Sequence, residues 1–366
     1  MIHDKQTEPA APDFHPAPTQ ARNSLIDLLR FIFIIPIVIG HQTVACGGLF
    51  PRSVMAVYFF FILSGYLAAV SIKKQTTPGL SYSRGFSVFM KRKILAVHPE
   101  VILTTLIFLI LLMSWASSSP RAVASLPVKA FFSDILFLRM TGIESSIGVE
   151  YGWYISSMLI GLAILYPFIR KWGSSLFFLL ASILIFGYVK IETGQLFPLY
   201  STPLGFTYAG NYMALGGLTL GIGIAAFREQ HKAPSKYANI LAMGFLLVSL
   251  YCMSTPFSPT DKPHTMDTLC LFSIAMLVLC TTGSRQEEVA QGSLRRKWQS
   301  LCIFLGKLTL PLYLVHITSP YICFSLFPST PGPGFTLIYL AVSIVSAFLV
   351  MLAANFLRKK IAHFYQ

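Results

Sequence analysis

Long apolar runs separated by short polar stretches fill the chain from residue 24 onward. A helix needs about 20 mostly apolar residues to cross the hydrocarbon core of a bilayer, and each run has close to that length. Ten such runs lie near residues 24–45, 53–72, 96–116, 151–169, 174–190, 208–227, 238–254, 266–283, 300–323 and 335–357. The pattern predicts an all-α membrane protein of about ten transmembrane helices, bundled around a central cavity, with no connecting loop long enough for a soluble domain.

Two stretches depart from this pattern. Residues 1–22 are polar and rich in proline and alanine, which predicts a disordered N-terminal tail before a single membrane domain over residues 23–366. The tail lacks the apolar core of a cleavable signal, so we expect the first span to act as its own insertion signal. Residues 121–141 are interrupted by Pro127 and by charges, which favours an interfacial or re-entrant segment over a further span.

Composition narrows the class of protein further. Hydrophobic residues make up 54% of the chain and charged residues only 11%, whereas soluble domains carry about a quarter charged residues. This excludes a soluble enzyme and a disordered protein. The six cysteines form no C-x-x-C pair and most lie inside apolar runs, so no metal or redox site is expected.

The net charge of +14 would suit a nucleic-acid partner, but the positions of the basic residues point to the membrane instead. With the N-terminus inside, twenty of the 28 lysines and arginines fall in cytoplasmic segments and six in outer ones, while Arg30 and Lys307 fall within spans. Positive residues concentrate on the cytoplasmic side of membrane proteins. We therefore predict that both termini are cytoplasmic, and we expect no nucleic-acid partner.

The first span carries three ionisable residues, Asp27, Arg30 and His41. Such groups are costly inside a membrane and are functional candidates by default. At about 100° per residue, His41 lies about 20° from Arg30 and about 40° from Asp27 around the helix, so the three share one face. Arg30 and His41 are ~16 Å apart along the axis.

This layout suits a reaction with one reactant on each side of the membrane. An arginine at the inner end can bind phosphates, and a neutral imidazole further out can act as a general base towards a hydroxyl. In the alternative interpretation, Asp27 and Arg30 neutralise each other as an i,i+3 pair and His41 merely ends the helix near the headgroups.

Five short motifs give the sequence a family resemblance. Asp27-Leu28-Leu29-Arg30, followed by ten residues and His41, resembles the R-x10-H signature of the integral-membrane acyltransferase-3 family. Four further segments are similar to later motifs of that family and follow in the same order: FFFILSGYL (59–67), KRKILAVHP (91–99), WYISSMLIGLAILYP (153–167) and GKLTLPLYLVH (306–316). The resemblance covers roughly residues 24–357.

The resemblance implies an enzyme that O-acylates surface polysaccharide or lipopolysaccharide with acyl-CoA from the cytoplasm. It assigns His41 as the catalytic residue, either as general base towards the acceptor hydroxyl or as the group that first accepts the acyl group. Arg30, Lys307, Arg92 and Lys93 are the expected donor-side residues, because the phosphates of coenzyme A need several cations. In the alternative, Lys307 snorkels to the interface, and Arg92 and Lys93 only set the orientation.

Three residues are candidates for the acceptor side. His316 is expected at a depth similar to His41, where it would orient the acceptor or relay a proton. Glu150 and Trp153 open the fourth span on the outer side; the carboxylate would orient His41 and the indole would stack on a sugar. Each has a structural alternative, namely a packing histidine, an acid at a helix N-terminus and an interfacial aromatic residue.

We therefore expect a bacterial inner-membrane O-acyltransferase that moves an acyl group, acetyl above all, from acyl-CoA to a hydroxyl of a cell-surface glycan or lipid-linked saccharide. The lipid bilayer is its expected environment. The main alternative is a secondary transporter in which Asp27, Arg30 and His41 form a polar or proton path. The inverted repeats typical of transporters are not evident in the sequence. The oligomeric state stays open.

Overall fold

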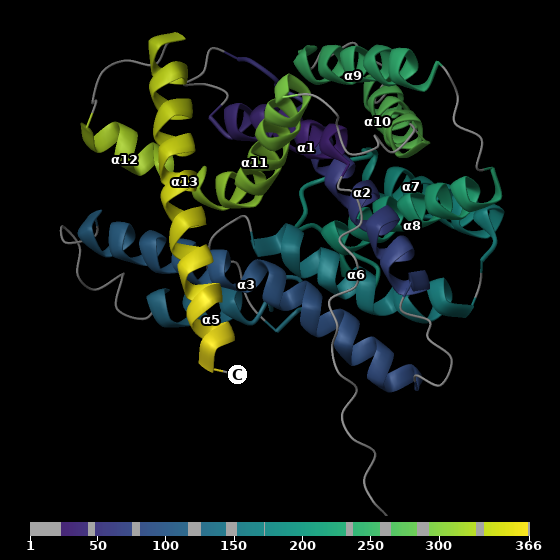
Figure 1. Ribbon diagram of the computed structural model, residues 1–366, viewed down its shortest axis with the longest axis horizontal. Helices are drawn as coiled ribbons and strands as arrows, with labels where there is room; N and C mark the ends of the chain where they lie inside the picture. Colours follow the sequence, from purple (N-terminus) through teal and green to yellow (C-terminus); the bar gives the residue numbers. More distant parts are fainter. Residues whose placement is uncertain are drawn as a thin grey trace, which may run out of the picture.

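The computed structural model describes residues 23–42, 48–74, 81–115, 126–143, 152–171, 173–231, 237–256, 265–283, 293–326 and 333–364. The predicted tail over residues 1–22 lies outside this part, as do Cys46 and the candidate Glu150. The described chain is almost entirely helical (Figure 1).

The helices are α1 Ser24–Gly40, α2 Ala56–Lys74, α3 Tyr82–Trp115, α5 Leu126–Ile135, α6 Gly152–Lys171, α7 Ser175–Thr193, α8 Ala209–Gln230, α9 Ala238–Ser254, α10 Thr265–Gly283, α11 Ser293–Val315, α12 Ser319–Leu326 and α13 Pro333–Phe364. A short 3-10 turn, η1 Ser53–Met55, precedes α2, and β1 Pro203–Leu204 pairs with β2 Thr207–Tyr208 in a small antiparallel hairpin.

By length and apolar composition, eight of the described helices can cross a membrane: η1 with α2, α3, α6, α7, α8, α10, α11 and α13. The other two predicted positions hold α1 and α9, which have 17 residues each, or about 26 Å at 1.5 Å per residue. Every predicted run therefore contains a helix, and the prediction of an all-α membrane protein is confirmed. The stretch 121–141 contains the short helix α5, whose 10 residues are too few to span a bilayer.

Two predicted boundaries are wrong. The run 300–323 is not one helix, because α11 ends at Val315 and α12 begins at Ser319. The Thr318 and Ser319 hydroxyls both donate to the Val315 carbonyl, at 2.7 and 3.0 Å, and such bonds compete with helix continuation. The third span begins at Tyr82 rather than near residue 96, because its first turns are helical but carry solvent-exposed cations that hide them from an apolar pattern.

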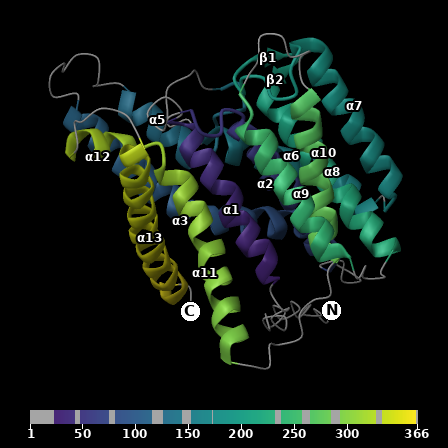
Figure 2. The same cartoon turned by 90° about the horizontal axis from the view of Figure 1, so that it is seen from above.

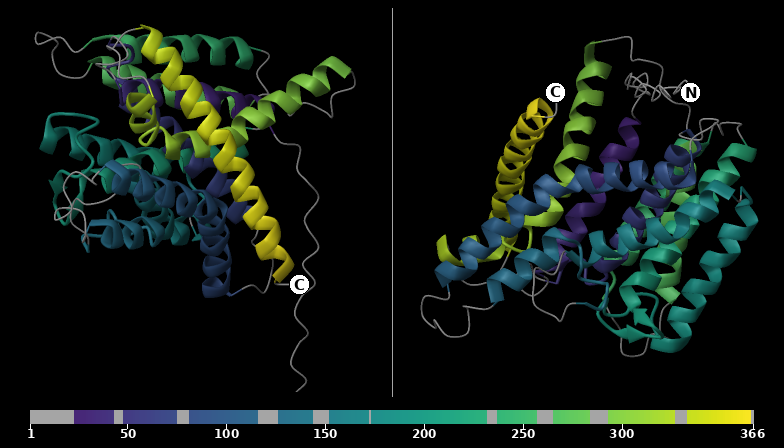
Figure 3. Two further views of the ribbon diagram at one scale, coloured as in Figure 1. Left: turned by 90° about the vertical axis from the view of Figure 1, so that its left-hand side faces the viewer. Right: turned by 90° about the horizontal axis from the view of Figure 1, so that it is seen from below.

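Helices far apart in the sequence pack as a row in the order α13, α11, α1, α2, α8 and α7 (Figure 2). α6 packs against α2 and α8, and α3 runs obliquely across the row (Figure 3). α1 begins and α13 ends at the same end of the bundle (Figure 2). The β1–β2 hairpin lies at the opposite end, where α1 ends.

α2 and α8 approach so closely that their glycines meet backbone. A Cβ on Gly65 would lie 2.1 Å from the Leu218 carbonyl oxygen, and one on Gly221 would lie 1.9 Å from the Ile62 carbonyl oxygen. Small residues permit this approach between membrane helices. The contact fixes α2, which forms one wall of the site described next.

Candidate functional site

A cavity of about 190 Å³ lies between α1, α2, α3, α6 and α11. On α1 it is lined by Arg30, Ile34 and Ile37, whose spacing places them on one helix face. His41 follows Ile37 by four residues, so the same face leads from the cavity to His41. Pockets that enclose a whole drug-sized ligand measure ~300–1,000 Å³. This cavity therefore suits the narrow part of a longer ligand.

One end of the cavity is cationic. Arg30 of α1 and Lys93 of α3 both line it and interact electrostatically with each other. Arg30 Nη1 lies 3.8 Å from the nearly buried Asp27 Oδ1, which compensates one of the two positive charges. Among the described residues, two cations line this end of the cavity beside the Asp27 carboxylate, an arrangement suited to an anion.

Gly306 of α11 is what allows Asp27 to sit beside Arg30. A Cβ on Gly306 would lie 2.5 Å from Asp27 Oδ1, so any larger residue would displace the carboxylate. The contact also fixes how α11 lies along α1 at this end. The two helices run in the same direction, because Asp27 contacts Gly306 near one end and His41 contacts His316 just beyond the other.

Two histidines meet beyond the other end of the cavity. The rings of His41 and His316 are 4.6 Å apart between centroids and meet edge-on at 72°. His41 is exposed, whereas His316 is 1% exposed. Tyr313, which lines the cavity, has its ring 5.6 Å from that of His316. The cavity wall therefore leads from Arg30 to the histidine pair.

The hydrogen bonds fix which ring nitrogen carries the proton in each neutral histidine. His41 Nδ1 lies 2.8 Å from the Ile37 carbonyl oxygen, and His316 Nδ1 is hydrogen-bonded to the Tyr313 carbonyl. A carbonyl only accepts, so Nδ1 must donate, and each Nε2 keeps its lone pair. Within the described structure, the buried His316 Nε2 has no hydrogen-bond partner. The pair can therefore accept a proton from a bound group.

Tyr339 of α13 holds the two histidine-bearing segments together. Its buried hydroxyl lies 2.9 Å from the His316 carbonyl oxygen and 3.2 Å from the Val38 carbonyl oxygen. It thus bridges the end of α1 to the turn after α11. The sequence analysis missed this residue, and a tyrosine inside an apolar run was the only available signal.

The expected donor-side cations do not all reach the cavity. Lys93 lines it, but Lys307 and Arg92 are exposed and are absent from its lining. Lys307 follows Gly306, so it projects from α11 away from the face that packs on Asp27.

On the acceptor side, Trp153 is nearly buried and stacks on Tyr200, with centroids 5.0 Å apart and planes 3° from parallel. Its neighbour Tyr154 lines the cavity. Tyr200 belongs to the loop that follows α7. The stack therefore lies between the cavity and that loop.

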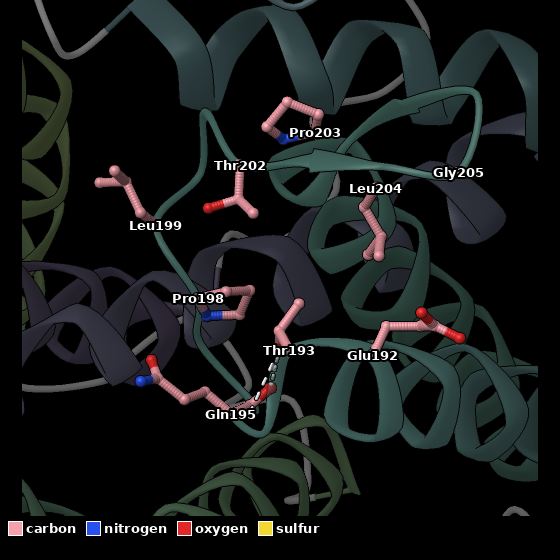
Figure 4. A pocket seen from close by; sticks show the side chains of 9 residues that line it. All are labelled: Glu192, Thr193, Gln195, Pro198, Leu199, Thr202, Pro203, Leu204 and Gly205. Atoms are coloured by element: carbon pink, nitrogen blue, oxygen red, sulfur yellow. Dashed lines mark hydrogen bonds between the residues drawn. The ribbon is translucent and has the colours of Figure 1, made fainter.

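The same loop borders an open cleft of about 500 Å³ (Figure 4). Its lining includes Glu192, Thr193, Gln195 and Thr202, and none of the predicted site residues. Thr193 Oγ1 is hydrogen-bonded to Gln195, which holds the loop against the end of α7. The lining includes Pro203 and Leu204 of β1, and the β1–β2 hairpin lies at the end of the bundle where α1 ends (Figure 2).

Comparison with known proteins gives the site its context. The sequence profile of a family described as an acyltransferase domain matches residues 23–353. The match includes every described residue of the cavity and the histidine pair. No curated protein and no solved structure gives a significant match. Because the profile covers nearly the whole chain, the protein is an integral membrane protein that belongs to the acyltransferase-3 family.

Proposed function

We propose that this acyltransferase transfers an acyl group, acetyl above all, from acyl-CoA to a hydroxyl of a cell-surface glycan or lipid-linked saccharide. The observation that carries the proposal is a single cavity with cations at one end and a histidine pair beyond the other. Family membership decides against the transporter hypothesis, which no feature of the described structure favours.

The donor's anionic part binds at the Arg30 and Lys93 end. Both cations line the cavity, and guanidinium binds phosphate oxygens in bidentate fashion. The cavity is too small for a whole nucleotide-bearing donor, so the nucleotide stays outside and the pantetheine arm enters. Arg30 and His41 are ~16 Å apart along α1, a distance that an extended arm of this kind can bridge. We place the anionic end at the cytoplasmic face of the inner membrane.

His41 acts as the base. Its Nε2 takes the proton of the acceptor hydroxyl while the hydroxyl oxygen bonds to the thioester carbonyl carbon. The carbon–sulfur bond then breaks, and the departing thiolate takes the proton from the imidazolium, so an ester and a free thiol are formed. In the alternative course, Nε2 bonds to the thioester carbonyl carbon and the carbon–sulfur bond breaks, which releases the thiolate. The acyl group then passes from Nε2 to the hydroxyl oxygen, and the hydroxyl proton ends on the thiolate.

His316 supports His41 from the buried side. The two rings are in contact, with centroids 4.6 Å apart, so His316 can act on a group bound at His41. The unpartnered His316 Nε2 is placed to accept a hydrogen bond from the acceptor or from protonated His41. This makes His316 a proton relay or an acceptor-orienting residue.

The acceptor approaches from the end of the bundle that holds the cleft of Figure 4. Carboxylate, amide and hydroxyl side chains there, from Glu192, Gln195 and Thr202, are groups that hydrogen-bond to sugar hydroxyls. Tyr200, from the loop that lines this cleft, stacks on Trp153, whose neighbour Tyr154 lines the donor cavity. In this proposal the saccharide extends from the cleft along the same end of the bundle to the exposed His41.

The test is acetyl transfer from radiolabelled acetyl-CoA to surface glycans and lipid-linked saccharides extracted from the source cells. Wild type is compared with His41→Ala and with the matched control His231→Ala, which changes an exposed histidine at the other end of the bundle. General-base catalysis contributes ~10²–10⁴-fold. We expect His41→Ala to lose activity by that factor and His231→Ala to keep it.

Equal activity of His41→Ala and wild type would refute the role of His41. A wild-type protein that transfers no label to any extract would refute the proposed donor and acceptor. Rapid acid quench separates the two chemical courses, because only attack by Nε2 leaves label on the protein before the acceptor is added.

A further inference from the structure

Two hydroxyl side chains line the cavity from neighbouring helices. They belong to Ser64 of α2 and Tyr154 of α6, and these two helices pack against each other. Thr309 also lines the cavity, but its hydroxyl donates to the Leu305 carbonyl of its own helix, at 3.2 Å. The Ser64–Tyr154 pair therefore offers polar atoms to a ligand in a wall that is otherwise mostly apolar.

The pair lies between the two ends of the proposed donor path. On one side Tyr154 interacts electrostatically with Arg30. On the other side its ring is 5.4 Å from the ring of Tyr313, which in turn contacts His316. A ligand that extends from Arg30 to the histidine pair must pass these hydroxyls.

Such a ligand carries amide groups. The arm of coenzyme A between phosphate and thiol contains two secondary amides, and a buried amide without a hydrogen bond loses its interactions with water. A hydroxyl can both donate to an amide carbonyl and accept from an amide N–H. Two hydroxyls in the wall of one cavity can thus satisfy one amide without a charged group.

We infer that Ser64 and Tyr154 bind an amide of the pantetheine arm and so select donors that carry this arm. The inference rests on the proposed function, because it takes acyl-CoA as the ligand. It gives the Ser-Gly pair of the second span a binding role in addition to helix packing: Gly65 packs on Leu218 of α8, while Ser64 lines the cavity.

The experiment measures dissociation constants of the purified protein for acetyl-CoA and for two analogues, each with one of the two arm amides replaced by methylene groups. The variants are Ser64→Ala and Tyr154→Phe. Tyr166→Phe is the control, because it removes a hydroxyl from the same helix at a position outside the cavity lining. Thermal unfolding of each variant verifies that it is folded.

A net hydrogen bond contributes about 0.5–1.5 kcal/mol, so each test variant is expected to weaken acetyl-CoA binding by about two- to tenfold. One of the two analogues lacks the amide that Ser64 and Tyr154 recognise. Variant and wild type should bind this analogue with equal dissociation constants. A structural role would instead weaken the binding of all three ligands by the same factor, which would overturn the inference.

Unchanged binding of acetyl-CoA to both test variants would also overturn it. Failure of the proposed function looks different, since wild type itself would then bind neither acetyl-CoA nor the analogues.

Discussion

Substituting alanine for Gly65 tests whether α2 and α8 pack as closely as the structure shows. The added Cβ would lie 2.1 Å from the Leu218 carbonyl oxygen and 2.8 Å from its Cα. These are backbone atoms, so one helix must move. Overpacking costs ~1–3 kcal/mol, whereas replacing glycine by alanine in a helix gains ~1 kcal/mol of propensity. We expect a net loss of up to about 2 kcal/mol in the free energy of unfolding.

Gly244→Ala is the matched control. Gly244 lies on α9, and a Cβ there would meet nothing within 4 Å. Only the propensity gain remains, so this variant should be more stable than wild type by up to ~1 kcal/mol. The two glycine-to-alanine changes are therefore expected to have opposite signs.

The assay is thermal unfolding in detergent with a thiol-reactive dye. Cys252, Cys270, Cys280, Cys302 and Cys323 are buried and free, so the dye reports loss of structure. The Gly65 variant should unfold at a lower temperature than wild type and the Gly244 variant at the same or a higher one. If Gly65→Ala raised the unfolding temperature as Gly244→Ala does, the α2–α8 contact would not be as close as described.

Three further predictions follow from single contacts. Tyr339→Phe removes the hydroxyl that donates to the Val38 and His316 carbonyls, and it should destabilise the protein by ~1–3 kcal/mol in the same unfolding assay. Unchanged stability and turnover would show that this hydroxyl does not hold the two histidine-bearing segments together. Lys93→Ala should raise the dissociation constant of acetyl-CoA more than Arg92→Ala does, because Lys93 lines the cavity and Arg92 does not. Calorimetric titration of each variant measures the two constants. A larger effect of Arg92→Ala would contradict the placement of Lys93. Asp267→Ala removes the carboxylate that lies 2.8 Å from the buried Arg52 guanidinium and should cost ~3–5 kcal/mol of unfolding free energy. The double variant in which methionine also replaces Arg52 should largely recover this loss.

Each of the ten apolar runs contains a helix, because burial in lipid requires a long apolar helix. It could not locate the start of α3 at Tyr82, where helical turns leave the apolar region and carry exposed cations. Nor could it locate the break at His316, which depends on hydroxyl donors to the Val315 carbonyl. Both differences depend on local hydrogen bonding and solvation rather than on mean hydropathy.

Helical periodicity was enough to place Arg30 and His41 on one face of α1, and the late motif singled out His316. Which of the other candidate residues line the cavity depends on how the helices pack side by side. Lys93 lines the cavity and Lys307 does not, although the sequence analysis predicts the same role for both. The bridge from Tyr339 to Val38 joins residues 301 positions apart, and no single-sequence pattern carries such a contact.

The most direct test of the central claim is whether the thiol of coenzyme A reaches the histidine end of the cavity. Ile37 lines the cavity, and its carbonyl binds His41. With Ile37→Cys under mild oxidation, a mixed disulfide with coenzyme A should form and appear as one added coenzyme A in the intact mass. Arg30→Ala in the same chain should slow the reaction. The control Leu247→Cys, on the exposed face of α9, should gain no adduct. An adduct at neither position, or at both equally, would contradict a donor arm that extends from Arg30 towards His41.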